Sequence, residues 1–226
     1  MKIGEVLTSW SGFKAWLSPP DRHAVAREAR ARAAALLPPG ETVVDGHTVE
    51  PGERVPQPPK PYRVDAFGNR PTVGGRLLNG AERVDLALDR INPFNAALDA
   101  WDRRGEDRDA QWHGGWESAA GRLAAALRPR TEEKYLSVLL LTEGGLHVVR
   151  VRLTSDGKKT AGAAEHACAV ARRDVTWLRD RKDVRHGTHE IGFADGSWVT
   201  VFLPLGGWGT LVEAFPHRLR HTDPRP

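Results

Sequence analysis

The chain has 226 residues, of which 40% are hydrophobic and 27% charged, and this composition is typical of a globular protein. The formal net charge is +4. Residues 1–130 carry 19 basic and 17 acidic side chains, and residues 131–226 carry 14 and 12, which argues against a dedicated basic domain.

Cysteine content and apolar run length predict the location of the protein. Cys168 is the only cysteine, which excludes an intramolecular disulfide and favours a reducing compartment. The N-terminus lacks the continuous apolar region of a signal peptide. A spanning helix needs roughly 20 predominantly apolar residues, and the run at 135–141 stops at Thr142-Glu143-Gly144-Gly145. We therefore expect a cytoplasmic protein without a transmembrane segment.

The sequence of residues 1–130 predicts a mainly helical region. Ser18, followed by two prolines, predicts a helix start, and the helix should run to Leu37. Residues 38–75 form a proline- and glycine-rich connection with one candidate strand at 41–49. Helical spacing returns over 81–101, interrupted at Asn92-Pro93, and again over 116–127.

After residue 130 the apolar period changes to two, which predicts strands. Two hairpins are expected, one joined by the glycines of "TEGG" and one by Ala194-Asp195-Gly196. The first strand has apolar residues on both faces, which predicts a strand buried on both faces, whereas the second strand alternates with arginines. The predicted strands are 135–141, 146–153, 164–170, 174–178, 189–193 and 197–203, followed by a helix at 207–215 and a tail at 221–226.

The motifs that would carry chemistry are incomplete. In "VTVFLPLGGWGTLVEAF" the third glycine of a dinucleotide-binding turn is replaced by Val212. His186 and His189 lack the further ligands of a zinc site. Cys168 and His166, two residues apart on a strand, should share a face, but no third group orients them. We therefore predict no catalytic residue, no cofactor and no metal, and we expect Trp112 and Trp116 to fasten their loop to the following helix.

The order of signals after residue 130 resembles the bacterial pleckstrin-homology-like domains and their GRAM-like relatives in actinobacteria. The resemblance is carried by "YLSVLLLTEGGLHVVRVRL", "VARRDVTWLRDR", "HEIGFADGSWVTVFLP" and "WGTLVEAF". It implies an α+β fold in which residues 131–220 form a strongly bent antiparallel sheet, capped by a C-terminal helix. The family usually has seven strands and this region has six candidates, so one strand is expected from upstream, at 41–49.

The resemblance also implies a ligand-binding set. Lipid-binding relatives use a lysine near the first strand and a basic pair on the second, and Lys134, Arg150 and Arg152 fall in similar places. Alternate residues on a strand point the same way and can converge on one phosphate group. The alternative is that both arginines occupy the solvent face while Val149, Val151 and Leu153 face the core.

Three functions follow as hypotheses. The first is a non-enzymatic interaction or adaptor protein that binds a protein partner or an anionic surface through a PH-like domain. The second is an enzyme with a site between the two regions and a histidine base, His113, His186 or His189. The third is nucleic-acid binding through the interleaved basic stretch, whose cations are Arg172, Arg173, Arg179, Arg181, Lys182 and Arg185.

Overall fold

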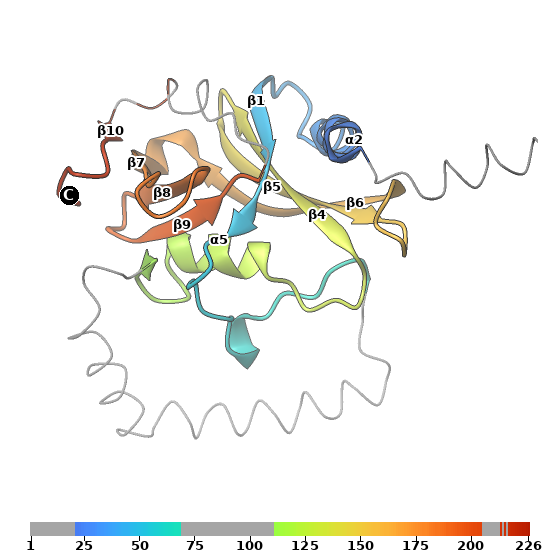
Figure 1. Cartoon of the computed structure of the whole chain (residues 1–226), viewed down its shortest axis with the longest axis horizontal. Helices are drawn as coiled ribbons and strands as arrows, with labels where there is room; N and C mark the ends of the chain where they lie inside the picture. Colours follow the sequence, from blue (N-terminus) through green and yellow to red (C-terminus); the bar gives the residue numbers. More distant parts are fainter. Residues whose placement is uncertain (1–20, 69–110, 205–212, 214, 216) are drawn as a thin grey trace, which may run out of the picture.

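The fold is α+β, with two mostly antiparallel sheets (Figure 1). Residues of both sheets belong to one apolar core. The computed structural model describes residues 21–68, 111–204, 213, 215 and 217–226. The predicted helices over 81–101 lie outside these residues, as does most of the predicted helix at 207–215. The predicted fold class is confirmed at the level of α+β; the described strands do not form a closed barrel.

The first sheet, sheet A, has the strand order β1-β4-β5-β6, and every neighbouring pair is antiparallel. The upstream candidate strand is confirmed, because β1 pairs with β4 although residues 49–134 separate the two strands. The strands are β1 (Val43–Thr48), β4 (Tyr135–Thr142), β5 (Gly145–Leu153) and β6 (Thr160–Ala171).

The second sheet, sheet B, has the order β10-β7-β8-β9-β2, and β3 also pairs with β9. Only the contact of β10 with β7 is parallel. Residues 218–219, just before the predicted tail at 221–226, therefore add a strand to sheet B, and we call residues 217–226 the C-terminal tail. The strands are β2 (Glu50–Pro51), β3 (Trp112–His113), β7 (Val175–Asp180), β8 (Thr188–Phe193), β9 (Trp198–Phe202) and β10 (Arg218–Leu219).

Sheet A is covered on both faces. Helix α2 (Arg22–Ala34) packs Ala29 and Ala33 against Val138 and Leu140 of β4. The alternate residues Leu139 and Leu141 belong to the other cluster, which helix α5 (Ala119–Leu127) shares with sheet B. The prediction that β4 is buried on both faces is thus confirmed, and residues before and after 130 contribute to the same core.

The helix start predicted at Ser18 is corrected, since the N-cap of α2 is Asp21. Its carboxylate accepts hydrogen bonds from the backbone N–H groups of His23 and Ala24. Asp is among the best N-cap residues because it satisfies donors that the first turn leaves unpaired.

The central helix α5 is capped by sheet B. Ser118 is its N-cap, and the β8–β9 turn supplies two further acceptors from Asp195 and Ser197. Trp112 and Trp116 pack together with ring centroids 4.6 Å apart and contact the core, as expected. Short 3-10 turns complete the described structure at η2 (Lys60–Tyr62) and η3 (Arg172–Asp174).

Candidate functional site

Arg150, one of the three predicted ligand residues, is 1% exposed. Its Nε donates to the carbonyl of Ala126 at 2.8 Å and its Nη1 to Glu165 Oε1 at 2.6 Å. The expectation that Arg150 faces solvent is wrong, because α5 covers that face of sheet A. Arg150 instead holds a carbonyl at the C-terminal end of α5, where the helix leaves acceptors unpaired. Its Nη2 has no hydrogen-bond partner among the described residues, and ligand binding stays a prediction.

The other two predicted ligand residues have different neighbours. Arg152 lies with its Cζ 5.3 Å from the ring centroid of Phe67 and pairs with Glu133 at 3.5 Å. Lys134 is exposed and lies beside Gly157 in the β5–β6 turn. The described contacts do not bring these side chains and Arg150 onto one common group.

The predicted nucleic-acid stretch is divided among several surroundings. Arg179 and Arg181 pair with carboxylates and are largely buried. The other four are exposed, with Arg172 5.8 Å from the ring centroid of Phe215 and Arg185 3.9 Å from that of Phe202. Four of the six predicted cations are therefore on the surface, and nucleic-acid binding stays a prediction.

The three predicted histidine bases lie in different places. His113 is exposed on β3, opposite Trp198. His186 is exposed in the turn before β8, whereas His189 is 5% exposed within that strand. Burial, with repulsion from His186 and His47, lowers the pKa of His189 to about 4, so its imidazole is neutral at physiological pH.

Cys168 and His166 do not share a face. A β-bulge in β6 places Cys168 opposite Val148 and His166 opposite the next residue, Val149. Cys168 packs against the apolar core, and burial raises the pKa of its thiol. His166 contacts His147, on the opposite face of sheet A. The expected shared face is therefore wrong, and the bulge is the cause.

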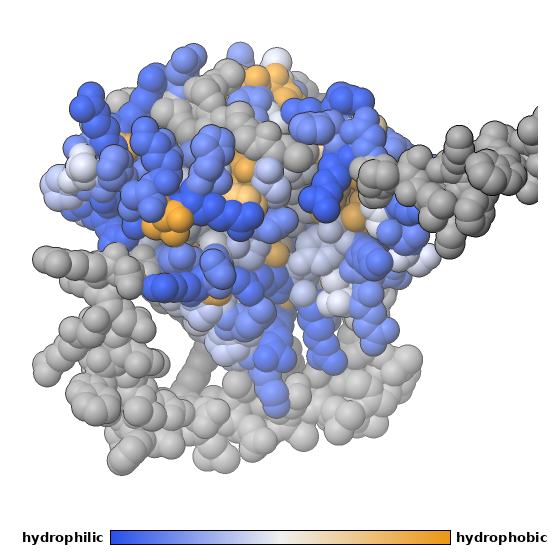
Figure 2. Space-filling view, in the orientation of Figure 1, coloured by the Kyte–Doolittle hydropathy of each residue, from blue (hydrophilic) through white to orange (hydrophobic). Residues whose placement is uncertain are grey.

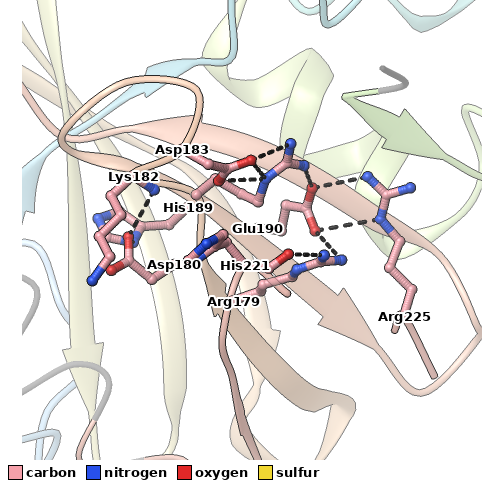
Figure 3. A network of polar contacts seen from close by, with 9 residues as sticks. Arg179, Asp180, Lys182, Asp183, His189, Glu190, His221 and Arg225 are labelled. Carbon is pink, nitrogen blue, oxygen red and sulfur yellow. Dashed lines mark hydrogen bonds and ion pairs between the residues drawn. The ribbon is translucent and has the colours of Figure 1, made fainter. Parts of the chain in front are cut away.

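A buried carboxylate, Glu190, is the centre of the polar network in Figure 3. Glu190 lies on β8 with no exposed surface. Arg181 donates to its Oε1, Arg225 Nη2 lies 3.0 Å from the same oxygen, and Arg179 Nη1 lies 3.6 Å from Oε2. Asp183 binds Arg181 at 3.0 Å. A buried carboxylate requires such partners, since an uncompensated charge in the interior is costly.

The origin of this network is the register of β7 and β8. Arg179 is directly opposite Glu190, and the neighbouring pair is Asp180 with His189. Opposite charges on facing positions stabilise an antiparallel pair. The third arginine comes from the C-terminal tail, 35 residues from Glu190 along the chain. Neither Glu190 nor Arg225 was predicted as a site residue, because sequence spacing does not show where a tail returns.

A second cluster joins Glu41, His147 and His166 on the α2 side of sheet A. His147 Nε2 lies 3.1 Å from Glu41 Oε2, and His147 Nδ1 lies 3.0 Å from His166 Nε2. His147 is 5% exposed, whereas His166 is exposed at the end of this series. A hydrogen bond from Thr142, followed by the attraction of His147, lowers the pKa of Glu41. Burial and His147 lower the pKa of His166, which favours its neutral form.

This cluster can pass a proton between a carboxylate, a buried imidazole and a surface imidazole. The cluster was not predicted from the sequence, because its members come from the segment before β1, from β5 and from β6. The alternation of His147 with apolar neighbours was the available signal, since it places a polar ring on a face that is otherwise apolar.

The described residues contain no group of three or more His, Cys, Asp or Glu side chains that could hold a metal ion. No helix in this part of the chain is long and apolar enough to span a membrane. Comparisons with protein-family models, curated proteins and solved structures each found no match.

Proposed function

We propose that this chain is a non-enzymatic interaction protein, built on a PH-like scaffold, that binds an extended segment of a protein partner along strand β6. The scaffold is supported by the longer strands: the upstream strand β1 joins the six strands β4 to β9 that follow residue 130, and the other three described strands, β2, β3 and β10, have two residues each. Two packed antiparallel sheets are also what the resemblance implies.

The observation that carries the partner proposal is the outer edge of β6. This strand has 12 residues, and among the described strands it pairs only with β5. Its sequence, TAGAAEHACAVA, contains neither lysine nor proline, and most of its residues are exposed or partly exposed. Its one charged residue, Glu165, pairs with Arg150, its register shifts twice against β5, and the Gly162 carbonyl accepts a hydrogen bond from Arg32 of α2 at 3.4 Å. Proteins usually protect such edges with charged residues, proline or a covering element, because unpaired backbone groups attract another strand. An extended peptide that pairs with β6 would satisfy those groups.

The surface gives less support to a broad apolar docking face. Figure 2 shows only small, separate apolar patches on the visible side. The exposed large apolar side chains among the described residues are one leucine and four valines, of which only two are adjacent in the sequence: Leu36, Val43, Val44, Val64 and Val184. Binding through backbone groups at an edge does not need a large apolar area.

The test compares three forms of the full chain as bait in a lysate of the native host. Ala161→Lys/Ala163→Lys places two cations on β6, and Ala31→Lys/Ala35→Lys adds the same charge at exposed positions of α2 and its C-cap. We expect a partner to bind the wild type and the α2 variant but not the β6 variant. Hydrogen exchange of β6 amides should slow in the complex. Equal capture by all three forms, with unchanged exchange in β6, would refute the proposal; sedimentation with anionic liposomes tests the anionic-surface alternative.

A second candidate, an enzyme with His166 as general base, is favoured by the Glu41–His147–His166 cluster. A carboxylate behind a buried imidazole fixes the tautomer of that imidazole and supports proton transfer at the exposed ring. Acylation by diethyl pyrocarbonate, followed by mass spectrometry, measures the reactivity of each histidine. We expect His166 to react faster than the exposed His113 and His186, and Glu41→Gln to remove the difference. Equal rates in the wild type would count against a catalytic His166.

A further inference from the structure

The C-terminal tail places Arg225 against the buried carboxylate of Glu190 (Figure 3), and an aromatic ring, that of Trp198, also lies against its guanidinium. Arg225 Nη2 lies 3.0 Å from Glu190 Oε1, and its Nε lies 3.4 Å from Oε2. Its Cζ lies 3.8 Å from the ring centroid of Trp198. Two hydrogen bonds to one carboxylate and a stacked indole match the planar, forked shape of a guanidinium group. We call Glu190 and Trp198 together the Glu190–Trp198 site.

This site is compensated without the tail. Glu190 and Asp183 carry two negative charges, and Arg179 and Arg181 carry two positive ones, all from β7, β8 and the turn between them. Arg225 is therefore a fifth charged member rather than the partner that neutralises Glu190. Its departure would not leave the buried carboxylate unpaired, which lowers the cost of exchanging it for another cation.

The segment that carries Arg225 is held by few backbone contacts. Its strand, β10, has two residues and lies parallel to β7, with Arg218 opposite Leu178 and Leu219 opposite Arg179. The carbonyl of His221 accepts a hydrogen bond from Arg179 Nη2 at 2.6 Å. A strand this short buries little area and occupies an edge of β7 that a longer segment would also fit.

We infer that the Glu190–Trp198 site binds an arginine of an extended segment from a partner protein, and that the chain's own tail competes for it. The partner segment would pair with the edge of β7 and place its arginine where Arg225 lies. A lysine would be a poor substitute, because it offers one ammonium group and cannot both fork to the carboxylate and stack flat on the indole. This site is on sheet B and does not depend on the binding proposed for β6.

A tethered tail competes at a high effective concentration, in the millimolar range for short connections. A free peptide should therefore bind the wild-type chain weakly and a chain without the Arg225 side chain more tightly. The probe is a fluorescent decapeptide with the sequence of residues 217–226, HRLRHTDPRP, and the protein is the full chain with Arg225→Ala. Two further peptides replace the final arginine by lysine or by citrulline, so that the protein and its folding stay constant across the comparison.

By fluorescence anisotropy, we expect the arginine peptide to bind Arg225→Ala at least tenfold more tightly than the wild type. We also expect it to bind at least tenfold more tightly than the lysine and citrulline peptides. Equal binding of the three peptides, or no binding to Arg225→Ala at 1 mM peptide, an upper limit set by the roughly millimolar effective concentration of a tether, would overturn the inference. A wild-type dimer that dissociates on Arg225→Ala would overturn it as well, because the occupant in trans would then be a second copy.

Discussion

The N-terminal cap of α5 yields a prediction with a magnitude. Asp195 Oδ2 accepts a hydrogen bond from Ala119 N–H at 2.8 Å, and Asp195 Oδ1 accepts from the hydroxyl and N–H of Ser197 at 2.5 and 3.0 Å. Ser197 Oγ in turn accepts from Ala120 N–H at 3.1 Å. Asp195 thus satisfies one helix donor directly and orients the acceptor of the next, with its negative charge at the positive end of the helix dipole.

Replacing Asp195 by alanine removes the direct cap, which is worth about 0.5–2 kcal/mol, and the charge at the helix end, worth about 0.3–1 kcal/mol. We expect the free energy of unfolding to fall by about 2 kcal/mol. Asp195→Asn keeps an acceptor and the turn preference of the hairpin, so it should lose only the charge contribution, about 0.5 kcal/mol.

Urea unfolding of the two variants, followed by circular dichroism at pH 7, measures both losses. Partial burial raises the pKa of Asp195, but hydrogen bonds from Ser197 and Ala119 outweigh it and hold the pKa below its usual value. The stabilisation should therefore be complete above about pH 4, the ordinary pKa of Asp, and disappear as the pH falls through the lower folded-state pKa. Equal losses for alanine and asparagine, or a loss below about 0.5 kcal/mol for alanine, would refute the cap assignment.

Three further predictions concern buried groups. Arg150→Met should lower the free energy of unfolding by about 3 kcal/mol, measured in urea, because Glu165 loses its charged partner and keeps only the Phe67 N–H donor, while the Ala126 carbonyl loses the donor from Arg150; a loss under about 1 kcal/mol would contradict the assigned role. Gly192→Ala should cost about 2 kcal/mol or more in the same assay, since an added Cβ would lie 2.0 Å from Trp177 Cε2, whereas the control Gly115→Ala meets nothing within 4 Å. His189 has a folded-state pKa of about 4, below its ordinary 6.5, so it destabilises the fold progressively as the pH falls from 6.5 to 4 and not above that range. His189→Gln should remove a loss of up to about 3 kcal/mol from the difference between pH 7 and pH 4, and an unchanged difference would show that His189 is not buried as described.

The sequence was sufficient for the elements whose signals are local. The Asp-Gly turn placed the β8–β9 hairpin, and the unbroken apolar run of β4 indicated a strand covered on both faces. The candidate strand at 41–49 was also found, as a segment with three valines inside a proline- and glycine-rich connection. In each case the position of the turn or strand depends on residues that are close together along the chain.

Arg150 shows why the sites were harder to predict than the strands. The alternation of apolar and basic residues in β5 correctly assigns its side chains to the two faces of sheet A, but it does not show which face another element covers. The usual inference places arginines in solvent, and it failed because α5 covers that face and offers a carbonyl, while Glu165 offers a carboxylate. His166 and Cys168 failed for a related reason, since a single-residue bulge changes the face and leaves no mark in the sequence.

The two proposed docking features follow from how the sheets end. Sheet A ends at β6, and among the described strands nothing pairs with its outer side. Sheet B would end at β7, but β10 covers that edge with two residues of the tail. The tail also contributes the side chain of Arg225, which binds in the Glu190–Trp198 site. The charges of Arg179, Arg181, Asp183 and Glu190 already balance without it. The buried network does not need the Arg225–Glu190 contact for charge balance, and the two-residue strand β10 protects the edge of β7 poorly. A competing segment can therefore replace both. The tail is therefore better explained as an exchangeable occupant of β7 than as a permanent part of sheet B.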